Sequence, residues 1–522
     1  RFAAYDGSAR GLTPPPLILT LPVGNVPLVS RYGFAIGAEG ASVVQQRTHP
    51  GFPTRTTDAP ACRGCQERDA TIAQLRQHLA QAEQQLQVLR ERAARHAGNS
   101  SIPPSANPPD APPLRPRRKS SGRRQGGQPG HPPAERAWVP AEQLTEPPIA
   151  CIPEVCHHCT SALSGSDSWP LRHQVIELPP IQPEVREYHR HLLTCPQCDH
   201  ATRGQLPEGV PHGAFGPRLQ ALIGLCTGCY HLSKRQTAEL LTTALNVPIS
   251  LGSIARVEQQ VSAALAEPVA QAHEHFRQAD VAHADETSWK QQPNKAWLWV
   301  GVTAYLAVFL VRGKRDLDSA RALLGPDFAG VLVTDRYAAY QGIRRRQLCW
   351  AHLRRDWQAL IDRGGTSRRV GRRLLRLTDK MFRHWQRVRD GTLTHERFGQ
   401  LMIPIRYQVS VLLHRGARCA HAKTAGTCRT ILDHESCLWT FVDVAGVEPT
   451  NNAAERALRQ AVLWRKKSFG TRSAAGSRYV ERILTAVATC RLQGRNVLEY
   501  LTSACDAVLR GQRAPSLLPG DC

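Results

Sequence analysis

Methionine, aromatic residues and acidic residues are all scarce in this sequence. Its 522 residues include two methionines, Met381 and Met402, 6% aromatic residues, and 43 Asp and Glu against 67 Lys and Arg. The shortage of acidic side chains leaves a formal net charge of +24, which favours a polyanionic partner, usually a nucleic acid. The hydrophobic content of 41% excludes a wholly disordered chain. The length predicts about three or four domains.

The sequence also lacks an apolar run long enough to cross a membrane. Its longest uncharged apolar run extends from Ala296 to Val311 and is shorter than the about 20 residues that a spanning helix needs. Its β-branched and aromatic side chains indicate two buried strands instead. We expect no secretory signal, so the 16 cysteines should be metal ligands and reduced thiols rather than disulfides. We therefore expect a cytoplasmic protein with no membrane partner.

Two segments of different composition open the chain. Residues 1–58 are rich in Gly, Pro, Ala and Val and show no helical or strand periodicity, so we expect an unstructured leader that need not belong to the working protein. Residues 59–97 predict a coiled-coil helix and a homo-oligomer, with a helix packed on its own domain as the alternative. Its seam follows alternating steps of three and four residues: Ile72, Leu75, Leu79, Ala82, Leu86, Leu89 and Ala93.

Residues 98–148 predict a Pro-rich and basic linker. It contains a basic arm, Arg117, Arg118 and Lys119 among its members, which we expect to bind DNA phosphates without reading sequence. A merely solvated linker is the alternative.

Two C-x-x-C pairs give the clearest metal motif. Cys156 and Cys159 are followed by Cys195 and Cys198, and two such knuckles can place four thiolates around one structural Zn²⁺. The pattern predicts a zinc-ribbon DNA-binding domain over 149–210, with short strands in HQVIELPP and VREYHRHLLTC.

Other cysteine pairs carry less information. Cys62 and Cys65 form a C-x-x-C without a partner pair and stay unassigned, whereas Cys226 and Cys229 lie in a helical pattern and are expected to be core residues. Residues 211–275 predict helices resembling a helix-turn-helix, with a plain helical hairpin as likely a reading.

From residue 276 the sequence predicts a catalytic core. The order is three antiparallel strands, a helix, a strand, and then a strand and helix, which is typical of a ribonuclease H-like mixed sheet. Asp285 and Asp335 are each expected at the end of a buried strand. Burying two carboxylates together is costly unless divalent metal binds them. Two Mg²⁺ (or Mn²⁺) ions about 3.5–4 Å apart can serve in-line phosphodiester displacement.

The third carboxylate is not fixed by spacing. Glu455 falls near the start of a helix that Asn451 or Asn452 can cap. On spacing alone a surface pair between Glu455 and Arg459 is the better interpretation.

Four sequence motifs identify the third carboxylate through their resemblance to a known family. ADETSW, TDRYAAY, CWAHLRRDW and NNAAERALR resemble, in order, the DDE-type transposases of insertion-sequence family 66. The resemblance covers roughly residues 60–511, including the coiled-coil, linker and zinc-ribbon segments. It implies that Asp285, Asp335 and Glu455 are the catalytic and Mg²⁺-binding triad. It also implies a helical insertion within the catalytic domain.

Basic residues around this core predict contacts with DNA. They are His352, Arg354, Arg355, Arg459, Lys466, Lys467 and Arg472, of which Lys466, Lys467 and Arg472 are expected in a Gly/Ser-bearing loop. The alternative is that Cys349 and Trp350 are core residues and that Arg354 and Arg355 are solvated.

The overall prediction is a multidomain α+β protein that acts as a DNA transposase. It would bind terminal inverted repeats and target DNA near the bacterial nucleoid, cut 3′ ends and transfer strands, with accessory transposition proteins as further partners. Two alternatives stay open: a non-catalytic DNA-binding regulator, and a metal-dependent nuclease without strand transfer. The predicted segments after the zinc ribbon are 211–275 helical, 276–363 first part of the core, 364–446 helical insertion, 447–511 second part of the core, and 512–522 tail.

Overall fold

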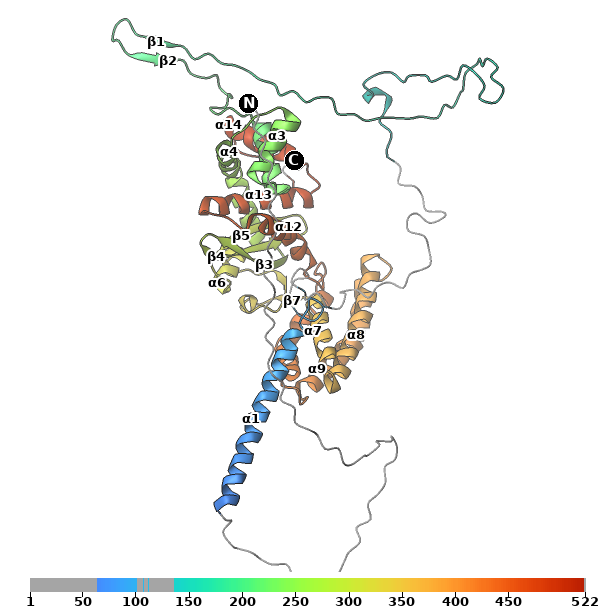
Figure 1. Ribbon diagram of the computed structural model, residues 1–522, viewed down its shortest axis with the longest axis vertical. Coiled ribbons are helices and arrows are strands. Elements are labelled where there is room, and N and C mark those ends of the chain that lie inside the picture. Colours follow the sequence, from blue (N-terminus) through green and yellow to red (C-terminus); the bar gives the residue numbers. More distant parts are fainter. Residues whose placement is uncertain (1–62, 101–106, 108–110, 112–135, 521–522) are drawn as a thin grey trace, which may run out of the picture. The chain divides into compact units, whose positions relative to one another are not determined.

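The computed structural model describes residues 63–100, 107, 111 and 136–520 (Figure 1). The predictions for residues 1–58, for Cys62 and for the basic arm at 117–119 lie outside these residues. The chain divides into two units, Arg1–Glu83 and Gln84–Cys522. Among the described residues, no helix combines the length and apolar character that crossing a bilayer requires.

Helix α1, Arg63–Ala93, contains the predicted seam. Its apolar side chains are exposed within the single chain: Leu75, Leu79 and Leu89 each retain 61% of their accessible surface. A helix with such a stripe gains little from burial unless another surface covers the stripe.

The region of the paired cysteines contains little regular structure. It has a short 3₁₀ helix, Ala141–Gln143, and a two-stranded antiparallel sheet of β1, Leu192–Thr194, and β2, Ala201–Arg203. The predicted strand in HQVIELPP is wrong, because residues 173–180 adopt no regular secondary structure. The two observed strands instead flank the second cysteine pair.

Helices α2 to α5 lead into the central sheet. Their bounds are α2 Pro217–Gly224, the π-helix η3 Leu225–Cys229, α3 Lys234–Leu245, α4 Leu251–Ala264 and α5 Ala266–Arg277. Ser250 accepts a hydrogen bond from the backbone N–H of Ser253 and so caps α4. Cys226 and Cys229 are buried.

A five-stranded mixed sheet with many helices confirms the mixed α/β organisation. Its strand order is β5-β4-β3-β6-β7. The first three strands in sequence are antiparallel, and β6 and β7 then run parallel to β3. The bounds are β3 Val281–Gln291, β4 Asn294–Val302, β5 Ala307–Arg312, α6 Leu317–Leu324, β6 Val331–Thr334, a short 3₁₀ helix η4 Ala338–Tyr340, and β7 Arg346–Leu348.

In the described part of the chain, eight further α-helices follow the sheet in sequence. They are α7 Trp350–Asp362, α8 Gly365–Arg389, α9 His395–Ala417, α10 Ala422–Leu432, α11 Thr440–Asp443, α12 Asn452–Ser468, α13 Ala474–Leu492 and, after these, α14 Val497–Leu509, with the 3₁₀ helix η5 Glu435–Leu438 before α11.

The two faces of the sheet are covered by different helices. On one face, Ala282, Ala284 and Trp299 join the core that includes α4 and α5. On the other face, Leu298 and Val300 pack with α12 and α13. Because side chains alternate along a strand, odd-numbered residues of β3 such as His283 and Asp285 lie on the α12 side.

Candidate active site

Asp285 lies on β3, and Asp335 directly follows the neighbouring parallel strand β6. The register pairs Val281 with Val331 and His283 with Val333, so continuing it by two residues brings Asp285 level with Asp335. Asp285 was expected to end its strand, but β3 continues to Gln291. The strand continues because the antiparallel partner β4 pairs with it as far as Gln291. Asp335 does follow its strand directly, since β6 ends at Thr334.

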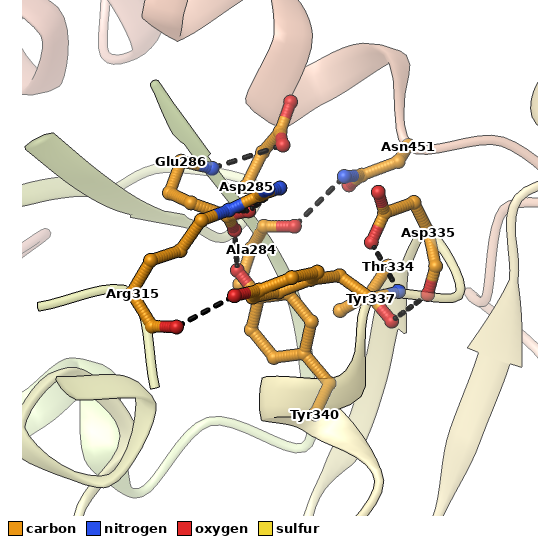
Figure 2. Close-up of polar contacts among 9 residues, drawn as sticks. All are labelled: Ala284, Asp285, Glu286, Arg315, Thr334, Asp335, Tyr337, Tyr340 and Asn451. Atoms are coloured by element: carbon orange, nitrogen blue, oxygen red, sulfur yellow. Dashed lines mark hydrogen bonds and ion pairs between the residues drawn. The ribbon is translucent and has the colours of Figure 1, made fainter. Parts of the chain in front are cut away.

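Two hydrogen bonds hold the backbone around Asp335 in place. The Asp335 carboxylate accepts a hydrogen bond from the backbone N–H of Tyr337 at 2.9 Å, which fixes the turn after β6. The carbonyl of Thr334 accepts a hydrogen bond from the backbone N–H of Cys349 at 2.8 Å, which joins the ends of β6 and β7. Figure 2 shows Asp335 beside Thr334 and Tyr337.

Asn451 brings the third carboxylate to the sheet. Its side chain is fully buried and donates from Nδ2 to the carbonyl of Ala284 at 2.8 Å (Figure 2). Its backbone N–H donates to the sulfur of Cys349 at 3.2 Å. Its carbonyl accepts the N–H of Glu455 at 3.1 Å, in the first turn of α12. Asn451 thus occupies the N-cap position of α12, but its side chain forms no capping hydrogen bond and instead bonds to β3.

Three neighbouring acidic residues disfavour the ionised form of Asp285. The pKa of Asp285 is raised well above its ordinary value, first by burial and then by the negative charges of Glu286, Asp335 and Glu455. Like charges that share a partly buried site disfavour ionisation. A divalent cation would reverse this, because it supplies the positive charge that these oxygens lack.

Glu286 is a residue that the sequence analysis missed. It points to the opposite face of β3, where its side chain is fully buried and accepts hydrogen bonds from Arg315 Nε at 2.7 Å and from the Tyr340 hydroxyl at 2.5 Å. The Arg315 guanidinium lies 3.6 Å from the ring centre of Tyr337. Figure 2 shows this network next to Asp285. The signal was available in the alternation of strand side chains, which points Glu286 away from Asp285.

His352 lies beside Glu455. Its Nδ1 is 3.8 Å from a Glu455 oxygen and has no hydrogen-bond partner among the described residues. Burial lowers the pKa of His352, with the charge of Arg355 acting in the same direction. Cys349, His352 and Glu455 offer ligand atoms that all lie within 4.8 Å of one another. Burial raises the pKa of the Cys349 thiol to about 11, which favours the protonated thiol over a thiolate ligand.

The remaining predicted DNA-binding residues lie outside this cluster. Arg354 forms an ion pair with Asp379 of α8 at 2.8 Å, so part of its role is to join α7 to α8. Arg459, Lys466, Lys467 and Arg472 are exposed. Lys466 and Lys467 were expected in a loop but belong to the last turn of α12, and only Arg472 lies in the connection to α13. Within the described residues, the Glu455 carboxylate lies 3.8 Å from the basic side chain of His352, and the predicted pair with Arg459 is not formed.

The four predicted zinc ligands form two local turns of the same design. Cys156 N–H donates to the carbonyl of Ser161, and Cys195 N–H donates to that of His200, both at 2.9 Å. The residues after the second cysteines, Thr160 and Asp199, have φ of 59° and 54°. Across the described residues, however, the set of close potential metal ligands contains none of these four cysteines, so the structure does not bring the two pairs together.

The structure thus places a cluster of acidic residues beside a mixed sheet. Comparison of the sequence with known protein families identifies the family. The chain belongs to the IS66 family of transposases, whose family model matches residues 212–479. A second model, described as a family of unknown function, matches residues 57–137.

Two curated relatives from Sinorhizobium fredii are themselves uncharacterised. The chain is 25% identical to protein y4qI over 279 residues, which cover 47% of this chain and 50% of y4qI. It is 24% identical to protein y4hP over 408 residues, which cover 69% of this chain and 71% of y4hP. The match to y4qI thus spans about half the length of that relative.

The raised pKa of Asp285 predicts a pH-dependent stability cost in the absence of metal. A carboxyl whose folded pKa is raised contributes most stability below its unfolded pKa, and that contribution is lost as the pH rises through the folded pKa. In EDTA at pH 8, Asp285→Asn should therefore raise the melting temperature by roughly 2–4 °C per kcal/mol recovered.

Thermal unfolding followed by circular dichroism checks this prediction. Asp316→Asn is the control, because hydrogen bonds from Ser319 lower the pKa of Asp316, so the substitution should not stabilise. An Asp285→Asn protein that melts at or below the wild-type temperature would contradict the electrostatic account.

Proposed function

We propose that the protein is a DDE-type DNA transposase. The observation that carries the proposal is the convergence of Asp285, Asp335 and Glu455 on one side of the sheet, in a chain of the IS66 transposase family. The strand order β5-β4-β3-β6-β7 also supports a ribonuclease H-like catalytic domain. Helices α8 to α11, between Gly365 and Asp443, would form the insertion between Asp335 and Glu455.

The donor set fits divalent cations. Asp285, Asp335 and Glu455 supply carboxylate oxygens, which Mg²⁺ and Mn²⁺ prefer, and the charge repulsion at Asp285 is the cost that a cation would remove. Two such ions, when bound, would supply Lewis acidity to the attacking and leaving oxygens of an in-line displacement. We assign all three carboxylates to holding them.

The chain's own residues supply position and charge. Asn451 fixes Glu455 against β3 through the Ala284 carbonyl. The lowered pKa of His352 keeps its ring neutral near pH 7, so its unpartnered Nδ1 can accept a proton or a hydrogen bond from the reacting strand. The reaction would cut at a DNA 3′ end and then join the freed 3′-hydroxyl to target DNA.

The DNA itself would lie along basic surfaces. Exposed arginines of α8 and α9 gather around one shallow depression, which is lined by Arg369, Arg372, Arg373, Arg376 and Arg415. Such a surface binds phosphates without reading bases. Arg355, Arg459, Lys466, Lys467 and Arg472 would extend the contacts around the catalytic side. Terminal inverted repeats and target DNA are the proposed partners.

The exposed seam of α1 supports a homo-oligomeric transposase. Leu75, Leu79 and Leu89 would be buried against a second copy of the same helix, which would remove their apolar surface from water.

Asp335→Asn tests the catalytic assignment. The substitution removes one charged metal ligand, an effect of several kcal/mol, so donor-strand cleavage with Mg²⁺ should fall by at least about a hundredfold. Asp379→Asn is the matched control, because it makes the same change at the ion pair with Arg354, and it should keep most of the activity. Undiminished cleavage by Asp335→Asn would refute the triad.

A pre-cut donor end separates the alternative functions. A transposase joins this end to target DNA, whereas a nuclease without strand transfer yields no joined product. A protein that binds the ends but neither cuts nor joins them in the wild-type form would be a regulator.

The cysteine pairs support one structural Zn²⁺ per chain. Both turns aim backbone N–H groups toward their sulfurs, and these groups lower the pKa of Cys195. Hydrogen bonding with Ser161 lowers the pKa of Cys159 to about 7. The lowered pKa values of Cys159 and Cys195 favour the thiolate form that binds zinc. Cys156 and Cys198 complete the two C-x-x-C pairs that would supply the other two sulfur ligands.

Metal analysis of the full-length protein checks the zinc assignment. Wild type should contain about one Zn²⁺ per chain, and Cys195→Ser should lose most of it. Cys437→Ser, at a partly exposed cysteine outside both turns, should retain it. Unchanged zinc in Cys195→Ser would exclude the zinc ribbon.

A further inference from the structure

A cavity of about 550 Å³ lies behind the helix that carries Glu455. Ala453, Arg456, Ala457 and Gln460 of α12 line it. These residues recur at steps of three and four along one side of the helix, whereas Glu455 is turned about 200° from Ala453 and so faces the other side. The cavity is therefore separate from the carboxylate cluster, although both use α12 and β3.

The interior of the cavity is apolar but contains two imidazoles. Strands β4 and β5 and helix α13 supply apolar walls, among them Phe309 and Leu484, while His231 and His283 supply polar groups. Each histidine is only 7% exposed. A volume of this size, with mostly apolar walls and a few convergent polar groups, is typical of a small-molecule site.

The hydrogen bonds fix which ring nitrogens face a ligand as acceptors. His231 Nε2 contacts the carbonyl oxygen of the Gln460 amide at 3.1 Å, so Nε2 must carry the hydrogen. Nδ1 is then an acceptor, and it is buried without a partner among the described residues. Leaving such an atom unsatisfied costs roughly 1–3 kcal/mol. A ligand that donates a hydrogen bond would remove this cost.

His283 follows the same logic. Asn451 donates from Nδ2 to Ala284, so its Oδ1 must accept from His283 Nδ1, at 3.3 Å. The remaining nitrogen, Nε2, is an acceptor on a residue that lines the cavity.

The charged residues of the cavity are at its exposed side. Arg456 and Arg491 line it and are both exposed, and Arg491 also donates to the Cys229 sulfur at 2.8 Å. Glu448 lines the cavity as well and offers an acceptor. The cavity thus combines inner hydrogen-bond acceptors with outer cations. A complementary ligand has a flat, largely apolar body with N–H donors and an acidic group.

We propose that this cavity binds a single nucleotide, with the base among the apolar walls and imidazoles and the phosphate at Arg456 and Arg491. The base amino group would donate to an imidazole nitrogen, and Glu448 would accept from the sugar hydroxyl. The choice of a nucleotide rests on the proposed function, because a DNA-processing enzyme meets this chemistry in its own substrate. The nucleotide could be free or an unpaired residue of DNA, and the two share the same contacts.

Calorimetry on the full-length protein tests the proposal with dAMP as the probe. Deoxyadenosine lacks the phosphate and inorganic phosphate lacks the base, so dAMP should bind at least about tenfold more tightly than either. Arg456→Ala should weaken dAMP binding by about tenfold. Arg510→Ala removes the same charge at an exposed arginine that pairs with Asp506 and does not line the cavity, and it should leave dAMP binding unchanged.

A second variant guards against indirect effects. Ala457→Phe adds volume to the cavity wall and should abolish dAMP binding while circular dichroism shows a folded protein. The proposal is overturned if dAMP binds no better than inorganic phosphate, or if Arg456→Ala and Arg510→Ala weaken dAMP binding equally.

Competition identifies the source of the nucleotide. A DNA duplex with one extrahelical adenine should displace dAMP where the fully paired duplex does not, if the ligand is a DNA residue; absence of displacement by both assigns the site to free nucleotide. Asp335→Asn should bind dAMP normally, so failure of the nucleotide site and failure of the catalytic triad are separate results.

Discussion

The candidate active site depends on one buried asparagine. Asn451 joins three segments that are far apart in sequence: β3 at Ala284, the end of β7 at Cys349, and the first turn of α12. Each polar group of Asn451 forms a hydrogen bond, and its side chain is fully buried. A residue that lacks the side-chain amide would leave a buried partner without a hydrogen bond, at a cost of about 1–3 kcal/mol. Because Glu455 follows one helical turn later, its position relative to Asp285 is set by this junction.

The same junction separates two chemically different environments. On one side of α12, carboxylates gather and raise the pKa of Asp285, which is an arrangement that a cation would stabilise. On the other side, neutral imidazoles line an apolar cavity. His283 contacts Asn451 and also lines the cavity. A ligand in the cavity would therefore touch a residue that is two positions from Asp285.

Local sequence patterns predicted the strands of the sheet well but not the contacts between segments. The run Val331–Thr334, between Gly330 and Asp335, is the buried strand expected before Asp335, because three of its four residues are β-branched. The role of Asn451 had no local signature, since an asparagine before a helix predicts a cap and its partner Ala284 lies 167 positions away. Glu286 was not predicted because the motif around Asp285 concerns the face of β3 that carries Asp285, and Glu286 lies on the opposite face. Lys466 and Lys467 were misplaced because α12 continues to Ser468, where Phe469 ends it in the left-handed conformation.

The central claim is that Asn451 assembles a metal site from three separate segments. Titration of the full-length protein with Mn²⁺, followed by electron paramagnetic resonance, tests it in Asn451→Ala and in Asn452→Ala, whose side chain is exposed at the neighbouring position. Asn452→Ala should bind Mn²⁺ as the wild type does, whereas Asn451→Ala should fold but bind it at least about tenfold more weakly. Equal Mn²⁺ binding by the two variants would contradict the account.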